Sequence, residues 1–149
     1  MTRPAAASLV AVVAAATFAL VSPSLAAAAS PSAWAKAADA LCVKAGADSQ
    51  KLPAAKTAKE RIATIEQSIV IGNRLASSLA RLPRPAAEAA EIAKLVGLYR
   101  QAVVLLRNVV AALRENDTAR VDKELARANV IGTSFSRSAT KLNALHCAQ

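Results

Sequence analysis

Three long stretches of the chain place an apolar or small residue every three or four positions, and this spacing constrains the fold most. Because the steps alternate between three and four, each set falls on one face of an α-helix and repeats every seven residues. The seam residues are Ile62, Ile65, Ile69, Gly72, Ala76 and Leu79; Ile92, Leu95, Tyr99, Ala102, Leu106, Val109 and Leu113; and Val121, Leu125, Ala128, Gly132, Phe135, Ala139 and Leu142. Such seams are typical of helices that pack nearly antiparallel in a bundle. No stretch alternates with period two for long enough to predict a strand.

Capping residues predict the starts of a first, shorter helix over about 31–45 and a second over about 57–82. Ser30 is the expected N-cap of the first helix, and Gly46 follows its predicted end. Thr57 and Glu60 have the spacing of a capping box, in which each side chain accepts a hydrogen bond from a free backbone N–H group.

Two breaks predict the remaining helices, over about 85–115 and 118–147. Prolines at 83 and 85 stop the second helix, because proline lacks the backbone donor that a helix interior needs. Asn116 and Asp117 predict a turn, with Asp117 as the N-cap of the last helix. Short turns favour a chain that folds back on itself over one extended coiled coil. The predicted fold is an all-α antiparallel four-helix bundle, with one short N-terminal helix and three long helices.

The turns also predict which residues lie at the same level. Tyr99 lies 18 residues before Asp117 and Phe135 lies 18 after it, while Ile69 and Tyr99 each lie 14 residues from a proline of the 83–85 turn. In antiparallel neighbours equal distances from a turn bring residues together. We therefore expect Ile69, Tyr99 and Phe135 to share one core layer.

The N-terminal region has the pattern of a secretory signal peptide. Arg3 precedes an apolar run over 5–21, and small residues follow over 24–29. This predicts a signal peptide over 1–29, cleavage between Ala26 and Ser30, a single domain over 30–149, and a secreted, extracytoplasmic protein. The alternative is a retained membrane anchor, but the run is at the short end of what spans a bilayer and no basic cluster follows it.

The chain contains two cysteines, Cys42 and Cys147. In an oxidising compartment a lone pair of cysteines is expected to join. The predicted disulfide would fix the first helix to the C-terminal end of the chain. A metal site that used His146 with the thiols is the alternative, but zinc sites use closely spaced ligand pairs that this sequence lacks, so no metal is predicted.

Catalysis is not predicted. His146 is the sole histidine, and the acidic pairs Glu88/Glu91 and Asp122/Glu124 lie in first helical turns, where carboxylates favour the helix dipole. The seams carry no charge, whereas an enzyme site needs polar groups that point inward. No nucleotide motif or phosphate-binding glycine loop occurs, so no cofactor is predicted.

Positive charge is the remaining signal. Residues 30–149 contain 18 Lys and Arg against 10 Asp and Glu, a net charge of +8. Arginines repeat every seven residues beside two of the seams, which predicts a basic ridge on each helix: Arg100, Arg107 and Arg114, then Arg120 and Arg127. A solvated face explains them without function. The functional hypothesis is binding to an anionic envelope polymer or to lipid head groups. Nucleic acid is not expected, because aromatic side chains for base stacking are scarce.

A second functional hypothesis is that the protein carries a small apolar ligand inside the bundle. Gly72 and Gly97 fall level with each other when counted from the 83–85 turn, and each costs about 1 kcal/mol relative to alanine in a helix interior. Close packing of a neighbouring ring would explain them, and so would a pocket lined by small residues.

Overall fold

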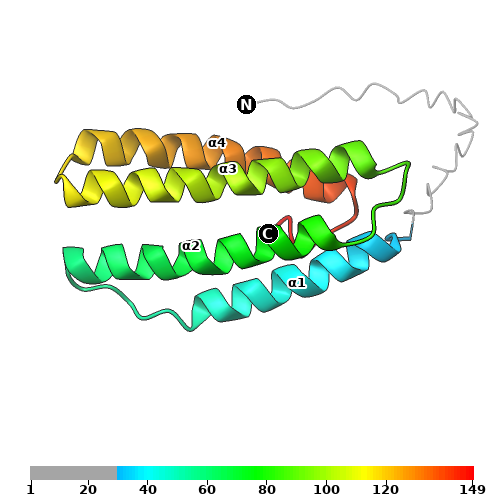
Figure 1. Cartoon of the computed structure of the whole chain (residues 1–149), viewed down its shortest axis with the longest axis horizontal. Helices are drawn as coiled ribbons and strands as arrows, with labels where there is room; N and C mark the ends of the chain where they lie inside the picture. Colours follow the sequence, from blue (N-terminus) through cyan, green and yellow to red (C-terminus); the bar gives the residue numbers. More distant parts are fainter. Residues whose placement is uncertain (1–29) are drawn as a thin grey trace, which may run out of the picture.

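The computed structural model describes residues 30–149, so the predicted signal peptide over 1–29 lies outside the described residues. Within this range the chain forms four antiparallel helices, as predicted (Figure 1): α1 Ala33–Gln50, α2 Ala58–Arg81, α3 Ala89–Arg114 and α4 Thr118–Lys141. Two predicted caps are confirmed. The Thr57 hydroxyl accepts from the Glu60 backbone N–H at 3.2 Å, and the Glu60 carboxylate accepts from that of Thr57 at 3.1 Å. Asp117 accepts from the Arg120 N–H at 2.9 Å.

The predicted bounds of α1 were wrong at both ends. Its N-cap is Ser32 rather than Ser30, with the hydroxyl 3.1 Å from the Ala35 nitrogen. The helix also continues through Gly46 to Gln50. Glycine ends a helix when the backbone turns left-handed, and no glycine among the described residues has a positive φ.

The bounds of α3 and α4 also differ from the prediction. After Pro85 the chain makes hydrogen-bonded turns, including one from the Glu88 N–H to the Pro85 carbonyl, so α3 begins at Ala89. Helix α4 ends at Lys141, six residues before the predicted end, because Asn143 adopts a left-handed φ of 54°. Residues 142–149 form a C-terminal segment of turns, which Figure 1 shows in red as it bends back toward α2 and α1.

The helices pack in chain order. Helix α3 lies between α2 and α4, and of the four described helices only α2 comes close to the backbone of α1. At one end of the bundle the C-terminal segment fills the space between α1 and α4. The arrangement is therefore a bundle in which one pair of helices, α1 and α4, is bridged by non-helical chain.

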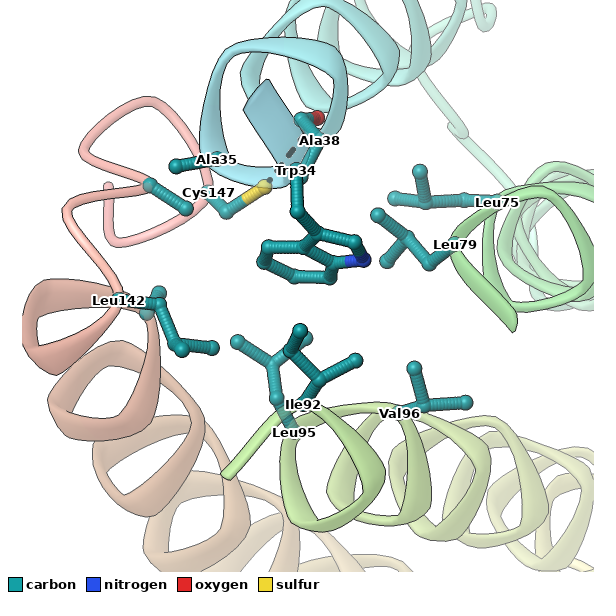
Figure 2. Packing of buried hydrophobic residues seen from close by; sticks show 12 residues of the cluster. Trp34, Ala35, Ala38, Leu75, Leu79, Ile92, Leu95, Val96, Leu142 and Cys147 are labelled. Atoms are coloured by element: carbon teal, nitrogen blue, oxygen red, sulfur yellow. Dashed lines mark hydrogen bonds between the residues drawn. The ribbon is translucent and has the colours of Figure 1, made fainter. Parts of the chain in front are cut away.

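The main core is built around Trp34, which is 2% exposed (Figure 2). Its indole lies among side chains from the other helices and the C-terminal segment: Leu75, Leu79, Ile92, Leu95, Val96, Leu142 and Cys147. The indole Nε1 is a buried donor with no hydrogen-bond partner among residues 30–149. The Ser32 hydroxyl donates to the Glu88 carboxylate at 2.9 Å, which adds a polar contact between α1 and the start of α3.

The predicted Cys42–Cys147 disulfide is confirmed, with the two Cα atoms 5.2 Å apart. Asp39 adds a second tether, since its carboxylate accepts from the backbone N–H groups of His146 at 2.8 Å and Cys147 at 3.3 Å. The His146 side chain itself is exposed. The cysteine near the C-terminus therefore holds the end of the chain against α1.

One member of the predicted core layer lies elsewhere. The rings of Tyr99 and Phe135 have centroids 5.3 Å apart, which matches the level counted from the 116–117 turn. On α2, however, the residue beside Tyr99 is Gly72, where an added Cβ would lie 3.7 Å from the ring. Ile69 instead borders Arg107 and other residues further along α3. The reason is that α3 starts at Ala89, four residues later than expected, which shifts its level against α2 by about one turn.

Candidate functional site

On the α3 ridge, Arg107 and Arg114 contact α2, whereas Arg100 lies on the side of α3 that borders α4. The Arg114 guanidinium is 2.6 Å from the Glu66 carboxylate, and Arg107 donates to the Asn73 amide oxygen at 3.4 Å. Both partners belong to α2. Two of the three ridge arginines are therefore engaged in contacts between helices.

The α4 ridge makes its contacts locally. Arg120 pairs with Glu115 at 2.8 Å, and Arg127 pairs with Glu124 at 3.1 Å. Glu124 is 6% exposed and also accepts from the Asn108 amide of α3 at 3.3 Å. The seven-residue repeat keeps each ridge in line on its own helix, but the five arginines do not gather on one surface.

An apolar groove of about 540 Å³ runs between α3 and α4. Of the described residues, those that line it all belong to these two helices: Arg100, Gln101, Val104, Leu105, Arg127, Val130 and Ile131. At 100° per residue, Val104 lies about 140° around α3 from Tyr99, which contacts Gly72. The groove therefore lies on the side of the α3–α4 pair that faces away from α2.

Two valines in the groove are strongly exposed, Val104 by 49% and Val130 by 67%. Single exposed valines are ordinary, but these are continuous with Leu105 and Ile131. Of the described helices, α3 is the one that is long and apolar enough to cross a membrane by length and composition alone, and only a third of its most apolar stretch is buried. Its apolar surface therefore exceeds what the core covers.

A stripe of six residues on α4, four of them cationic, passes along this groove, and two of its members, Arg127 and Val130, line it. It advances by alternating steps of four and three and so keeps one face of the helix: Lys123, Arg127, Val130, Ser134, Arg137 and Lys141. Within residues 30–149, Lys123 and Arg137 form no ion pair, and neither does Arg100 across the groove. We call this stripe together with the groove residues the α3–α4 outer face.

One carboxylate near this face serves as a link between helices. Glu91 of α3 accepts from the hydroxyl of Ser138 on α4 at 2.6 Å, and Ser138 is fully buried. This hydrogen bond is the main reason why the pKa of Glu91 is lowered, and the charges of Lys94 and Lys141 lower it further while burial opposes them. The Glu91 carboxylate therefore links α3 to α4 through this hydrogen bond.

Sequence reasoning missed the α3–α4 outer face, although a signal for it was present. A spacing of seven residues identified the arginine ridges. Alternating steps of four and three along α4 also place Val130 on the same helix face as the cations. At Gly72 there is no room for a pocket, because an added Cβ would lie 2.9 Å from Val103 and 3.7 Å from the Tyr99 ring.

No protein-family model, curated protein or solved structure matches this chain.

Proposed function

We propose that the protein attaches to an anionic lipid surface of the cell envelope through the α3–α4 outer face, and that it acts by binding rather than by catalysis. The observation that carries this proposal is the apolar groove with cations on both rims. Arg100 stands on the α3 rim, and Lys123 and Arg137 lie on the same stripe of α4 as Val130. Each cation near an anionic bilayer contributes about 1 kcal/mol of attraction.

The exposed valines favour a lipid surface over a soluble anionic polymer. A polymer would neutralise the cations but leave Val104 and Val130 in water. A bilayer interface receives both kinds of side chain, and apolar area removed from water contributes about 25 cal/mol per Å². An anionic bilayer offers charged head groups to the cations and an apolar layer beneath them to the groove, so it fits this surface better than a soluble polymer does.

Export would bring the protein to such a surface. The Cys42–Cys147 bond supports export, because disulfides persist in oxidising compartments and are rare in the cytosol. The N-terminal signal pattern supports it independently from the sequence.

The apolar part of the proposal is tested with vesicles of phosphatidylcholine mixed with phosphatidylglycerol. Val104→Ser with Val130→Ser should weaken co-sedimentation of the protein severalfold. The matched control is Val43→Ser with Val70→Ser, since these valines are 52% and 56% exposed on α1 and α2. Equal binding by both double variants would contradict a contact through the groove.

The charged part is tested by removing two cations from the α3–α4 outer face. A control variant loses the same number of positive charges elsewhere. Arg100→Gln with Arg137→Gln should lower retention on the mixed vesicles and shift release to lower salt, because exposed charges are screened over about 8 Å at 0.15 M. The control is Arg107→Gln with Arg114→Gln, whose side chains contact α2. If both pairs shift equally, net charge and not this face governs binding.

A further inference from the structure

A second hollow, of about 650 Å³, opens between α1 and α4 where these helices are not packed together. The stacked pair of Tyr99 and Phe135 lines it, with Leu75 beside them. Burial raises the pKa of the Tyr99 phenol above its ordinary value, so the phenol stays uncharged even in moderately alkaline solution. The volume falls within the range of about 300–1,000 Å³ that is usual for small-molecule sites.

Two glycines border this hollow from opposite helices, Gly46 on α1 and Gly132 on α4. Each costs about 1 kcal/mol relative to alanine in a helix. At Gly72 the reason for a glycine is clear, because an added Cβ would lie 2.9 Å from Val103. At Gly46 and Gly132 an added Cβ would meet nothing within 4 Å, so packing within the protein does not require a glycine at either position. An occupant of the hollow would supply that reason.

The chemistry of the lining restricts the occupant. Among residues 30–149, no lysine, arginine, aspartate or glutamate lines the hollow. Hydrogen-bonding groups come from neutral serine and glutamine side chains and from the histidine: Ser49, Gln50, Ser136, His146 and Gln149. An aromatic wall with small residues around it accommodates a flat apolar body, and the neutral polar groups accommodate one or two polar atoms.

We infer that the hollow between α1 and α4 is a binding site for a small, uncharged, mainly apolar molecule with an aromatic ring. It shares no residue with the groove of the α3–α4 outer face. The protein could therefore hold this ligand while it is attached to a lipid surface, and neither site depends on the other.

The disulfide is part of this site. Cys42 and Cys147 both line the hollow, as do His146 and Gln149 of the C-terminal segment. That segment forms one wall, and the covalent bond to α1 fixes it in place. Reduction should loosen the wall and weaken ligand binding.

The experiment uses N-phenyl-1-naphthylamine, an uncharged aromatic dye whose fluorescence rises in apolar surroundings. The oxidised protein should bind it, and Gly132→Leu should weaken binding by at least about tenfold, or 1.4 kcal/mol, because the new side chain fills the hollow. Helix stability should not suffer, since leucine has a higher helix propensity than glycine and meets no neighbour within 4 Å of its Cβ.

The matched control is Gly97→Leu, another mid-helix glycine with open space around it but outside the hollow. It should bind the dye like the wild type, and so should Val104→Ser with Val130→Ser. Absence of dye binding by the oxidised wild type would overturn the inference. So would equal losses in the two leucine variants, or loss only in the valine variant, which would place the dye in the α3–α4 groove.

Discussion

Replacing Cys42 and Cys147 together by serine removes the covalent link that closes a loop with a sequence separation of 105 residues. In the chain-entropy model the bond lowers the entropy of the unfolded chain by about 16 cal/mol/K, so its loss lowers the free energy of unfolding by about 4.8 kcal/mol at 25 °C. Domains of this size are stable by about 5–15 kcal/mol, so the loss removes between about a third and nearly all of the free energy of unfolding.

The contacts around the bond determine what remains after it is lost. Asp39 still accepts two backbone hydrogen bonds from the C-terminal segment, and Leu142 still packs against the Trp34 core. We therefore expect a folded but weakened protein at low temperature. Its melting temperature should fall by roughly 15–20 °C.

The assay is equilibrium denaturation in urea, followed by circular dichroism at 222 nm, on the oxidised wild type and the double serine variant. Asp39→Asn in both backgrounds measures the second tether. It should cost more in the serine variant, about 1.5–3 kcal/mol, because there the segment is held without a covalent bond and depends more on the hydrogen bonds to the charged carboxylate. A loss below about 1 kcal/mol for the double serine variant would refute the loop-closure reasoning.

Three further perturbations test the packing. Trp34→Phe should cost less than about 2 kcal/mol, because it removes a buried donor without a partner, whereas Trp34→Ala should cost about 3–5 kcal/mol in the same urea assay. Gly72→Ala should lower the free energy of unfolding by about 1–3 kcal/mol, since the new Cβ would lie 2.9 Å from the stiff Val103 side chain. Gly132→Ala should raise it by up to about 1 kcal/mol, because its Cβ meets nothing within 4 Å. Thermal melts would compare the two variants directly. Because the pKa of Glu91 is lower in the folded state than in the unfolded chain, its stabilising effect is complete above about pH 4.5 and is lost as pH falls through the folded value. Ser138→Ala should reduce that acid dependence in urea titrations at several pH values.

The long helices and their caps could be predicted because the signals are local. Thr57 with Glu60 and the seams of α2 to α4 lie within single turns or heptads, and each agrees with the others. The disulfide could be predicted because the chain offers one pair of cysteines. The ring contact of Tyr99 and Phe135 followed from a turn of two residues, in which little error can accumulate.

The missed features depend on conformations that residue identity alone does not set. Gly46 was interpreted as a helix end, but the left-handed positions fall at Asn116 and Asn143. The 82–88 connection includes turns after Pro85, and these moved Ile69 out of the predicted layer. Trp34 begins a stripe with Ala38, Leu41 and Ala45, but alanine makes such a pattern faint, so α1 was not expected to carry the core tryptophan.

The α3–α4 outer face needed both helices at once. Val104 and Val130 lie on different helices and become one groove only when α3 and α4 are antiparallel at the observed level. The partners of Arg107 and Arg114 likewise lie on α2, so their engagement could not be seen along α3 alone.

The most direct test of the proposed attachment is flotation of the oxidised protein, residues 30–149, with vesicles of phosphatidylcholine and phosphatidylglycerol at 0.15 M salt. The wild type should float with the mixed vesicles and stay behind with pure phosphatidylcholine. The variant with both Val104→Ser and Val130→Ser should lose most of the floating fraction, while that with Val43→Ser and Val70→Ser keeps it. If the wild type does not float with the anionic vesicles, or if both valine variants float equally well, the α3–α4 outer face is not a lipid-binding surface.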